Sequence, residues 1–126
     1  MAFYWGISEW SAARITEAIE LCDKKGLHPP VVTQPEYNML NRDRFEKEYR
    51  PLFERNKMGT TVWGPMASGI LSGKYNDGNF PEGSRMAGNN FSSSYNLQKY
   101  FNENRKEKTL KALNGMVDLA KELGYT

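Results

Sequence analysis

Cysteine, histidine and long apolar runs are almost absent from this chain of 126 residues. A single cysteine, Cys22, cannot form an internal disulfide, so we expect a reducing setting. No apolar run reaches the ~18 residues that a membrane-spanning helix needs. The opening MAFYWGIS also lacks the basic flank and cleavage pattern of a secretory signal. We therefore expect a soluble, cytoplasmic protein without a membrane span.

Neither sign of charge dominates. The 17 Lys and Arg residues and 15 Asp and Glu residues are interspersed and leave a net charge of +2, which argues against a dedicated nucleic-acid or anionic-membrane surface. The one histidine, His28, stands in a loop before two prolines, and no metal-ligand spacing is present. With 39% hydrophobic residues, the chain is expected to bury one modest core as a single domain.

Three short β-prone runs alternate with helical patterns. The runs at 3–7, 29–34 and 59–63 predict strands, and strands that alternate with helices predict a parallel sheet. The polar residues 76–96, rich in Asn, Ser and Gly, predict an excursion over the surface.

Apolar residues at helical spacing predict three helices. Gly26 is expected to end the first, Asn41 to cap the second and Pro51 to kink or restart it. The positions expected to be buried are Ile15, Ala18, Ile19 and Cys22, then Phe45, Tyr49, Leu52 and Phe53, and finally Leu110, Leu113, Val117 and Ala120.

A parallel sheet of three strands leaves two architectures: a small open doubly wound sheet, or part of an eight-stranded (β/α) barrel. The first strand is followed by WGISEWSA, which lacks the glycine pattern of a dinucleotide-binding turn. In a barrel, ligands are bound at the C-terminal strand ends, and here those ends, 6–9, 34–38 and 63–68, are polar or aromatic. These observations favour part of a barrel, but the residues alone leave both architectures open.

The segment VWGPMASGILSGKY, residues 62–75, combines small residues with one lysine. Gly69 and Gly73 leave room for backbone N–H groups to approach an anion, and Lys74 adds a compact positive charge. The same composition is typical of a plain turn, so a phosphate-binding loop and a turn both remain open.

Several separated motifs together resemble the aldo-keto reductase family, and within it the potassium channel beta-subunit branch. These motifs are YWGISEWSAARITEAI, QPEYNML, RPLFERNKMGTTVWGPMASGILSGKYNDG and GSR. They follow the order of the family's fifth to seventh barrel units, so the resemblance makes residues 1–126 a partial NADP-dependent oxidoreductase domain. It implies an α/β fold that is a partial (β/α)8 TIM barrel of about three βα units with a parallel sheet. It also implies that the barrel binds NADPH across the strand ends and transfers hydride to aldehydes or ketones.

The resemblance also implies roles for individual residues. Ser8 and Gln34 would bond the nicotinamide carboxamide, and Trp63 would stack on the nicotinamide ring. A loop including Lys74 would hold the pyrophosphate, and Arg85 would lie near the adenosine phosphate. The full set of implied cofactor-binding residues is Ser8, Glu9, Gln34, Trp63, Gly64, Pro65, Met66, Ala67, Ser68, Lys74, Ser84 and Arg85.

Two of these positions depart from the family pattern. Gly64 stands where the family often has serine, which removes one hydroxyl. Glu9 stands where some members have arginine or asparagine, and its carboxylate would accept an amide hydrogen bond without attracting phosphate.

In the family, the catalytic tyrosine, lysine, aspartate and histidine or asparagine come from the first four barrel units, so none is assigned here. Two functions stay open. One is the C-terminal portion of an NADPH-binding aldehyde or ketone oxidoreductase, inactive by itself, with a small carbonyl substrate once the barrel is complete. The other is a non-catalytic accessory protein that partners a potassium channel alpha subunit and uses the cofactor site as a redox sensor or not at all. Exposed strand edges of a partial barrel predict oligomers.

Overall fold

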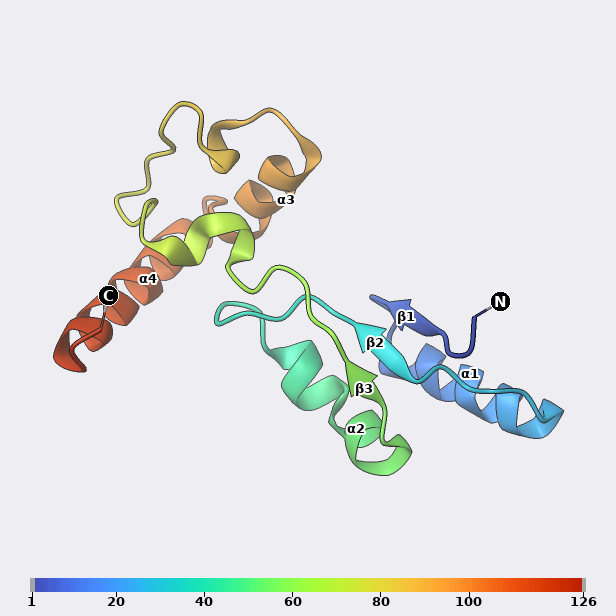
Figure 1. Ribbon diagram of the computed structural model, residues 1–126. Coiled ribbons are helices and arrows are strands. Elements are labelled where there is room, and N and C mark those ends of the chain that lie inside the picture. The colour runs from blue at the N-terminus through green and yellow to red at the C-terminus, as the bar shows by residue number, and fades with distance from the viewer. Residues whose placement is uncertain (1, 126) are drawn as a thin grey trace. The chain divides into compact units, whose positions relative to one another are not determined.

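The computed structural model describes residues 2–125, which form two compact units divided between Pro65 and Met66. The first unit alternates strands and helices in the predicted order (Figure 1). Its three strands are parallel and lie in the order β1-β2-β3, which confirms the α/β parallel sheet. Its elements are β1 (Gly6–Ser8), α1 (Ala12–Lys25), β2 (Val32–Gln34), a π-helical turn η1 (Arg44–Glu48), α2 (Arg50–Asn56) and β3 (Gly59–Thr60).

The close approach of β1 to β2 depends on Gly6. Gly6 is in register with Val32, and Ser8 is in register with Gln34. A Cβ at position 6 would lie 2.3 Å from Cγ1 and 2.7 Å from the carbonyl oxygen of Val32. Only glycine fits at this position, and the fit brings the ends of the two strands side by side.

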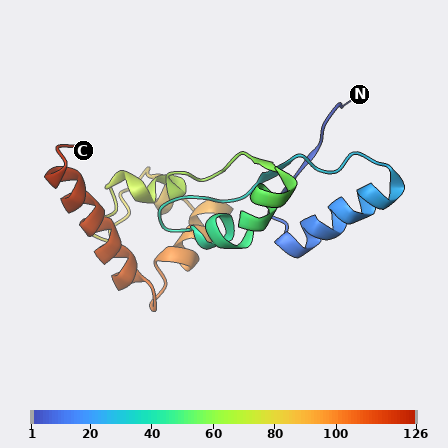
Figure 2. The ribbon, with the colours of Figure 1, turned by 90° about the horizontal axis from the view of Figure 1, so that it is seen from below.

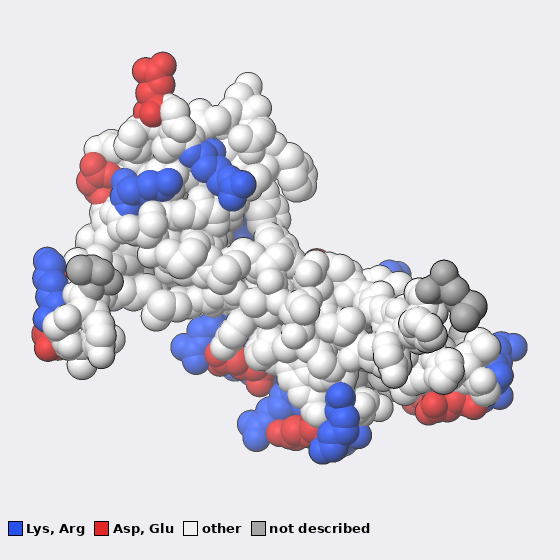
Figure 3. Space-filling view, in the orientation of Figure 1, with Lys and Arg blue, Asp and Glu red and all other residues white. Residues whose placement is uncertain are grey.

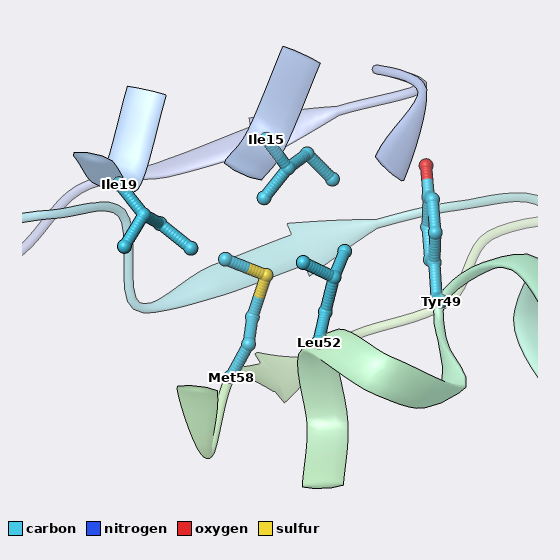
Figure 4. Close-up of a cluster of buried hydrophobic side chains, with 5 residues drawn as sticks. All are labelled: Ile15, Ile19, Tyr49, Leu52 and Met58. Carbon is cyan, nitrogen blue, oxygen red and sulfur yellow. The ribbon is translucent and has the colours of Figure 1, made fainter. Parts of the chain in front are cut away.

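Helix α1 follows its sequence signals closely. The Ser11 side chain accepts a hydrogen bond from the Arg14 N–H at the start, and Gly26 ends the helix in the left-handed conformation at φ 63. Its apolar stripe packs against α2 and the residues after it (Figure 4). The buried cluster consists of Ile15, Ile19, Tyr49, Leu52 and Met58, with Ile7 of β1 packed against it.

The second predicted helix is divided in two, and its predicted cap is wrong. Asn41 does not cap a helix; it pairs with Asn38 in an antiparallel bridge, and the chain becomes helical only at Arg44. The bridge satisfies the Asn41 N–H with the carbonyl oxygen of Asn38, so the chain forms a turn there instead. Pro51 lies in the first turn of α2, where its missing N–H costs no helical hydrogen bond, so the predicted restart is confirmed.

The second unit contains one helix that the sequence pattern did not predict. Its elements are the 3-10 segments η2 (Ala67–Ser72) and η3 (Arg85–Ala87) and the helices α3 (Phe91–Tyr100) and α4 (Lys106–Glu122), the last visible along its length in Figure 2. The predicted surface excursion 76–96 contains η3 and the start of α3, two elements that the prediction did not include. Asn90 and Ser93 form a reciprocal capping box that starts α3 within this polar segment.

Each of the two units buries its own apolar side chains. In the second unit, these include Ile70, Tyr75, Met86 and Leu113. Acidic and basic side chains are interspersed over the face in Figure 3. Within residues 2–125, no helix has the length and apolar character to cross a membrane.

Candidate functional site

The C-terminal ends of β1 and β2 place two predicted site residues next to each other. The Ser8 hydroxyl donates a hydrogen bond of 2.9 Å to the backbone carbonyl of Gln34. The side-chain amide of Gln34 donates to the Thr61 hydroxyl at 3.1 Å. A hydroxyl carries two lone pairs and a primary amide carries two N–H groups. Ser8 therefore keeps acceptor capacity and Gln34 keeps donor capacity at this edge of the sheet.

Trp63 continues the third strand beyond β3 at the same edge. Its backbone N–H donates to the Pro35 carbonyl, its own carbonyl accepts from Tyr37, and it forms a parallel bridge with Glu36. The predicted strand 59–63 is thus regular only over β3, but its pairing extends to Trp63. Trp63 remains 39% exposed, so a ligand can reach this residue.

Glu9 joins the three strand ends. One carboxylate oxygen, Oε1, accepts hydrogen bonds from the indole Nε1 of Trp63 at 2.8 Å and from the backbone N–H of Glu36 at 2.6 Å. The other oxygen, Oε2, pairs with the Arg44 guanidinium from η1. Glu9 itself adopts a left-handed backbone conformation at φ 59, which is strained for a residue with a side chain. The sequence placed Glu9 at the site but did not predict these partners.

Asn38 anchors the start of the glycine-rich segment. Its side-chain amide donates to the Gly64 carbonyl at 3.0 Å and to Oε1 of Glu36 at 3.2 Å. Gly64 has φ 65, a left-handed conformation that disfavours any residue with a side chain. Asn38 was not among the predicted site residues, although it lies in the polar strand end 34–38 that the sequence analysis singled out.

The glycine-rich segment of the second unit has an unusual backbone. Three successive residues, Ala67, Ser68 and Gly69, have positive φ values of 47, 57 and 94. Left-handed conformations cost non-glycine residues about 1–3 kcal/mol each and persist only where the surroundings hold them. Met66 is exposed next to this turn, whereas Ala67 is buried.

Asn96 of α3 holds this turn. Its buried side-chain amide donates to the Ser68 hydroxyl at 3.0 Å and to the Ser92 backbone carbonyl at 2.7 Å. The hydroxyls of Ser68 and Ser92 are 3.3 Å apart. Because the sequence pattern did not predict α3, it offered no signal for Asn96.

Lys74 folds back over the same turn. A Cβ on Gly69 would lie 3.2 Å from Cε and 3.3 Å from Nζ of Lys74, so the absence of a side chain makes room for the ammonium group. The ammonium also lies 5.0 Å from the centre of the Tyr75 ring. A positive charge therefore lies beside the Gly69 backbone, in space that a side chain at position 69 would need.

Tyr75 connects this loop with the segment that contains Ser84 and Arg85. The tyrosine is fully buried, and its hydroxyl accepts a hydrogen bond of 3.3 Å from the Met86 N–H. Burial raises the pKa of Tyr75, but the Ser84 hydroxyl, the hydrogen bond from the Met86 N–H and the nearby Lys74 together outweigh it and hold the pKa below its ordinary value of 10.0. Arg85 begins η3 with an exposed side chain.

The predicted cofactor-binding residues thus fall into two groups, each gathered within one unit. The first group lies at the strand ends and consists of Ser8, Glu9, Gln34, Trp63, Gly64 and Pro65. The second surrounds the loop after Pro65 and consists of Met66, Ala67, Ser68, Lys74, Ser84 and Arg85. The part of the chain that the structure describes contains no group of three or more His, Cys, Asp or Glu side chains able to hold a metal ion.

Comparisons with known proteins define the class. The Aldo/keto reductase family profile matches residues 2–126, so the chain belongs to that family. It is 46% identical over 126 residues to a probable voltage-gated potassium channel subunit beta of Oryza sativa subsp. japonica, covering 100% of this chain and 37% of that protein.

Two further relatives carry similar names. A probable voltage-gated potassium channel subunit beta of Arabidopsis thaliana is 46% identical over 125 residues, which cover 99% of this chain and 36% of that protein. A putative voltage-gated potassium channel subunit beta of Schizosaccharomyces pombe is 56% identical over 86 residues, which cover 68% of this chain and 25% of that protein. The chain therefore spans between a quarter and little more than a third of the length of these curated relatives.

Proposed function

We propose that residues 1–126 form the fifth to seventh units of a (β/α)8 barrel and supply the NADP(H)-binding part of an oxidoreductase that acts on aldehydes or ketones. One observation carries the proposal. The ends of β1 and β2 and the extension of β3 meet at one edge, where Ser8, Gln34 and Trp63 lie on neighbouring strands. Parallel barrels bind their ligands at this edge.

The chemistry of these side chains fits a nicotinamide headgroup. Its carboxamide needs one acceptor and one donor, and Ser8 and Gln34 retain both beyond their bonds within the chain. The exposed part of the Trp63 indole offers a flat surface that would keep water from one face of the ring. When bound, the cofactor supplies the hydride, and these residues hold and orient it.

The second group of residues fits the phosphates. Lys74 places an ammonium group beside the backbone of Gly69, where no side chain of residue 69 stands in the way. Tyr75 links this loop to the segment with Arg85, whose exposed guanidinium suits the 2′-phosphate that distinguishes NADPH from NADH. A glycine-rich loop followed by two cations supports a phosphate-binding role over a plain turn.

Two substitutions test the cofactor site in the full-length gene product that contains residues 1–126. Lys74→Ala should weaken NADPH binding about tenfold or more, the effect of losing a hydrogen bond to a charged group. Arg85→Ala should lower the preference for NADPH over NADH while leaving NADH affinity nearly unchanged. Titrations followed by tryptophan fluorescence measure both.

Lys121→Ala is the matched control, because it removes one exposed lysine from the end of α4. Its affinity for NADPH should equal that of the parent. If Lys74→Ala and Arg85→Ala also bind NADPH as tightly as the parent, the phosphate site is refuted.

The residues proposed here bind and orient; none of them is assigned as the proton donor that stabilises a developing alkoxide. We therefore expect residues 1–126 by themselves to reduce no aldehyde, and we expect the partial barrel to self-associate through its exposed strand edges. NADPH oxidation by this polypeptide with an aromatic aldehyde would contradict the first expectation, and a monomer in sedimentation the second.

A non-catalytic role is the second candidate, favoured by the potassium channel subunit beta names of the relatives. In this case the chain belongs to an accessory subunit of a channel, and the cofactor site senses redox state or serves no purpose. Steady-state turnover of the full-length gene product separates the two. Sustained aldehyde reduction supports the enzyme, whereas tight NADPH binding without turnover supports the accessory role.

A further inference from the structure

Hydrogen bonds hold both the backbone and the side chain of Trp63. Its backbone N–H and carbonyl both bond the segment 35–37, and its indole N–H donates to Glu9 at 2.8 Å. A tryptophan has two side-chain torsions, and a hydrogen bond at the far end of the ring restricts both. The ring plane is therefore set by Glu9 and not by backbone pairing alone.

Glu9 in turn is fixed by groups other than Trp63. The same Oε1 accepts the Glu36 N–H at 2.6 Å, and Oε2 pairs with Arg44. Arg44 also lies 3.7 Å from Oε2 of Glu48, whose other oxygen accepts the N–H of Ala12 at 2.8 Å. The carboxylate that accepts the indole N–H therefore follows β1 directly and is held by residues of η1, which in turn contact the start of α1.

We propose that Glu9 is a positioning residue that sets the plane of the Trp63 indole for contact with the nicotinamide ring of the cofactor. The proposal rests on the proposed function of this site. It differs from a direct role in which the carboxylate accepts a hydrogen bond from the carboxamide, because the oxygens of Glu9 already receive three donors from the chain itself.

The first measurement needs no cofactor. In the full-length gene product labelled with ¹⁵N at tryptophan, Trp63→Phe identifies the indole signal of Trp63. Glu9→Ala should shift this signal, whereas Glu9→Gln, which retains an oxygen acceptor, should shift it less. Glu9→Asp is shorter by one methylene and should resemble Glu9→Ala, which keeps the test available if the alanine variant folds poorly. An unchanged Trp63 signal in both shortened variants would overturn the proposal.

The second measurement is a double-mutant cycle for NADPH affinity. Glu9→Ala should weaken binding about tenfold, and Glu9→Gln should restore most of the loss. In the Trp63→Phe background the indole N–H is gone, so Glu9→Ala should change affinity less than about twofold. A tenfold loss that persists in this background would show direct contact with the cofactor and overturn the positioning role.

Glu54→Gln is the matched control, because Glu54 pairs with Arg50 at 2.7 Å on the exposed surface of α2. It should leave both the Trp63 signal and NADPH affinity unchanged. A parent protein that binds no NADPH would overturn the proposed function and, with it, the role of Glu9. If the parent binds NADPH but the Glu9→Ala and Glu9→Asp variants keep the parent's Trp63 signal, only the role of Glu9 is overturned.

Discussion

Gly6→Ala should strongly destabilise the first unit. The added Cβ would lie 2.3 Å from Cγ1 and 2.7 Å from the carbonyl oxygen of Val32, both closer than real Cβ atoms approach. A side-chain atom can move away, but the carbonyl oxygen belongs to the backbone of the central strand. Overpacking of this kind costs about 1–3 kcal/mol, and we expect the upper end because β1 must separate from β2.

Gly59→Ala provides a control in the same sheet. Gly59 is in register with Val32 from the opposite side, but a Cβ there would meet only the Val31 carbonyl oxygen at 3.5 Å, an ordinary contact. This variant should differ from the parent by no more than about 0.5–1 kcal/mol, with stabilisation favoured because alanine restricts the unfolded chain. Adding Val32→Ala to Gly6→Ala should recover part of the loss, since it removes the contact with Cγ1 but not with the carbonyl.

Urea unfolding of the full-length gene product, followed by circular dichroism, measures these free energies of unfolding. Because Ser8 depends on the same register for its hydrogen bond to Gln34, NADPH affinity should fall with stability in Gly6→Ala. If Gly6→Ala is as stable as Gly59→Ala, the tight pairing of β1 and β2 is refuted.

Two further predictions concern the second unit. Asn96→Ala removes the amide that bonds the Ser68 hydroxyl and the Ser92 carbonyl, so it should destabilise the protein by about 1–3 kcal/mol and weaken NADPH binding, measured by urea unfolding and fluorescence titration. Hydrogen bonds from the backbone and side chain of Asn79 hold the pKa of Asp77 below 3.8. Its stabilisation is therefore complete above pH 3.8 and lost as the pH falls through the lower folded-state pKa, and Asp77→Asn should abolish this part of the acid dependence of unfolding. An unchanged acid dependence would contradict it.

The elements that the sequence predicted well have strong local signals. Helix α1 combines an apolar stripe with Ser11 at its start and Gly26 at its end, and all three appear in the structure. The apolar period of α4 likewise marked Leu113, which is buried, whereas the predicted positions Leu110, Val117 and Ala120 are only half-buried. By contrast, α3 contains three consecutive serines and starts from a capping box within a polar segment, so no apolar period marked it. Tertiary contacts of Asn96, Ser93 and Tyr100 stabilise this helix despite its composition.

By itself, the sequence determined the alternation of strands and helices, the polar and aromatic character of the strand ends, and the resemblance that the family match confirms. These follow from residue periods and motifs that act over a few positions. Only the tertiary structure decided which residues meet at the site. Glu9 bonds a tryptophan 54 residues away, and Asn96 bonds a serine 28 residues away. Such pairs depend on strand register and helix packing, which place distant residues together without leaving a local pattern between them.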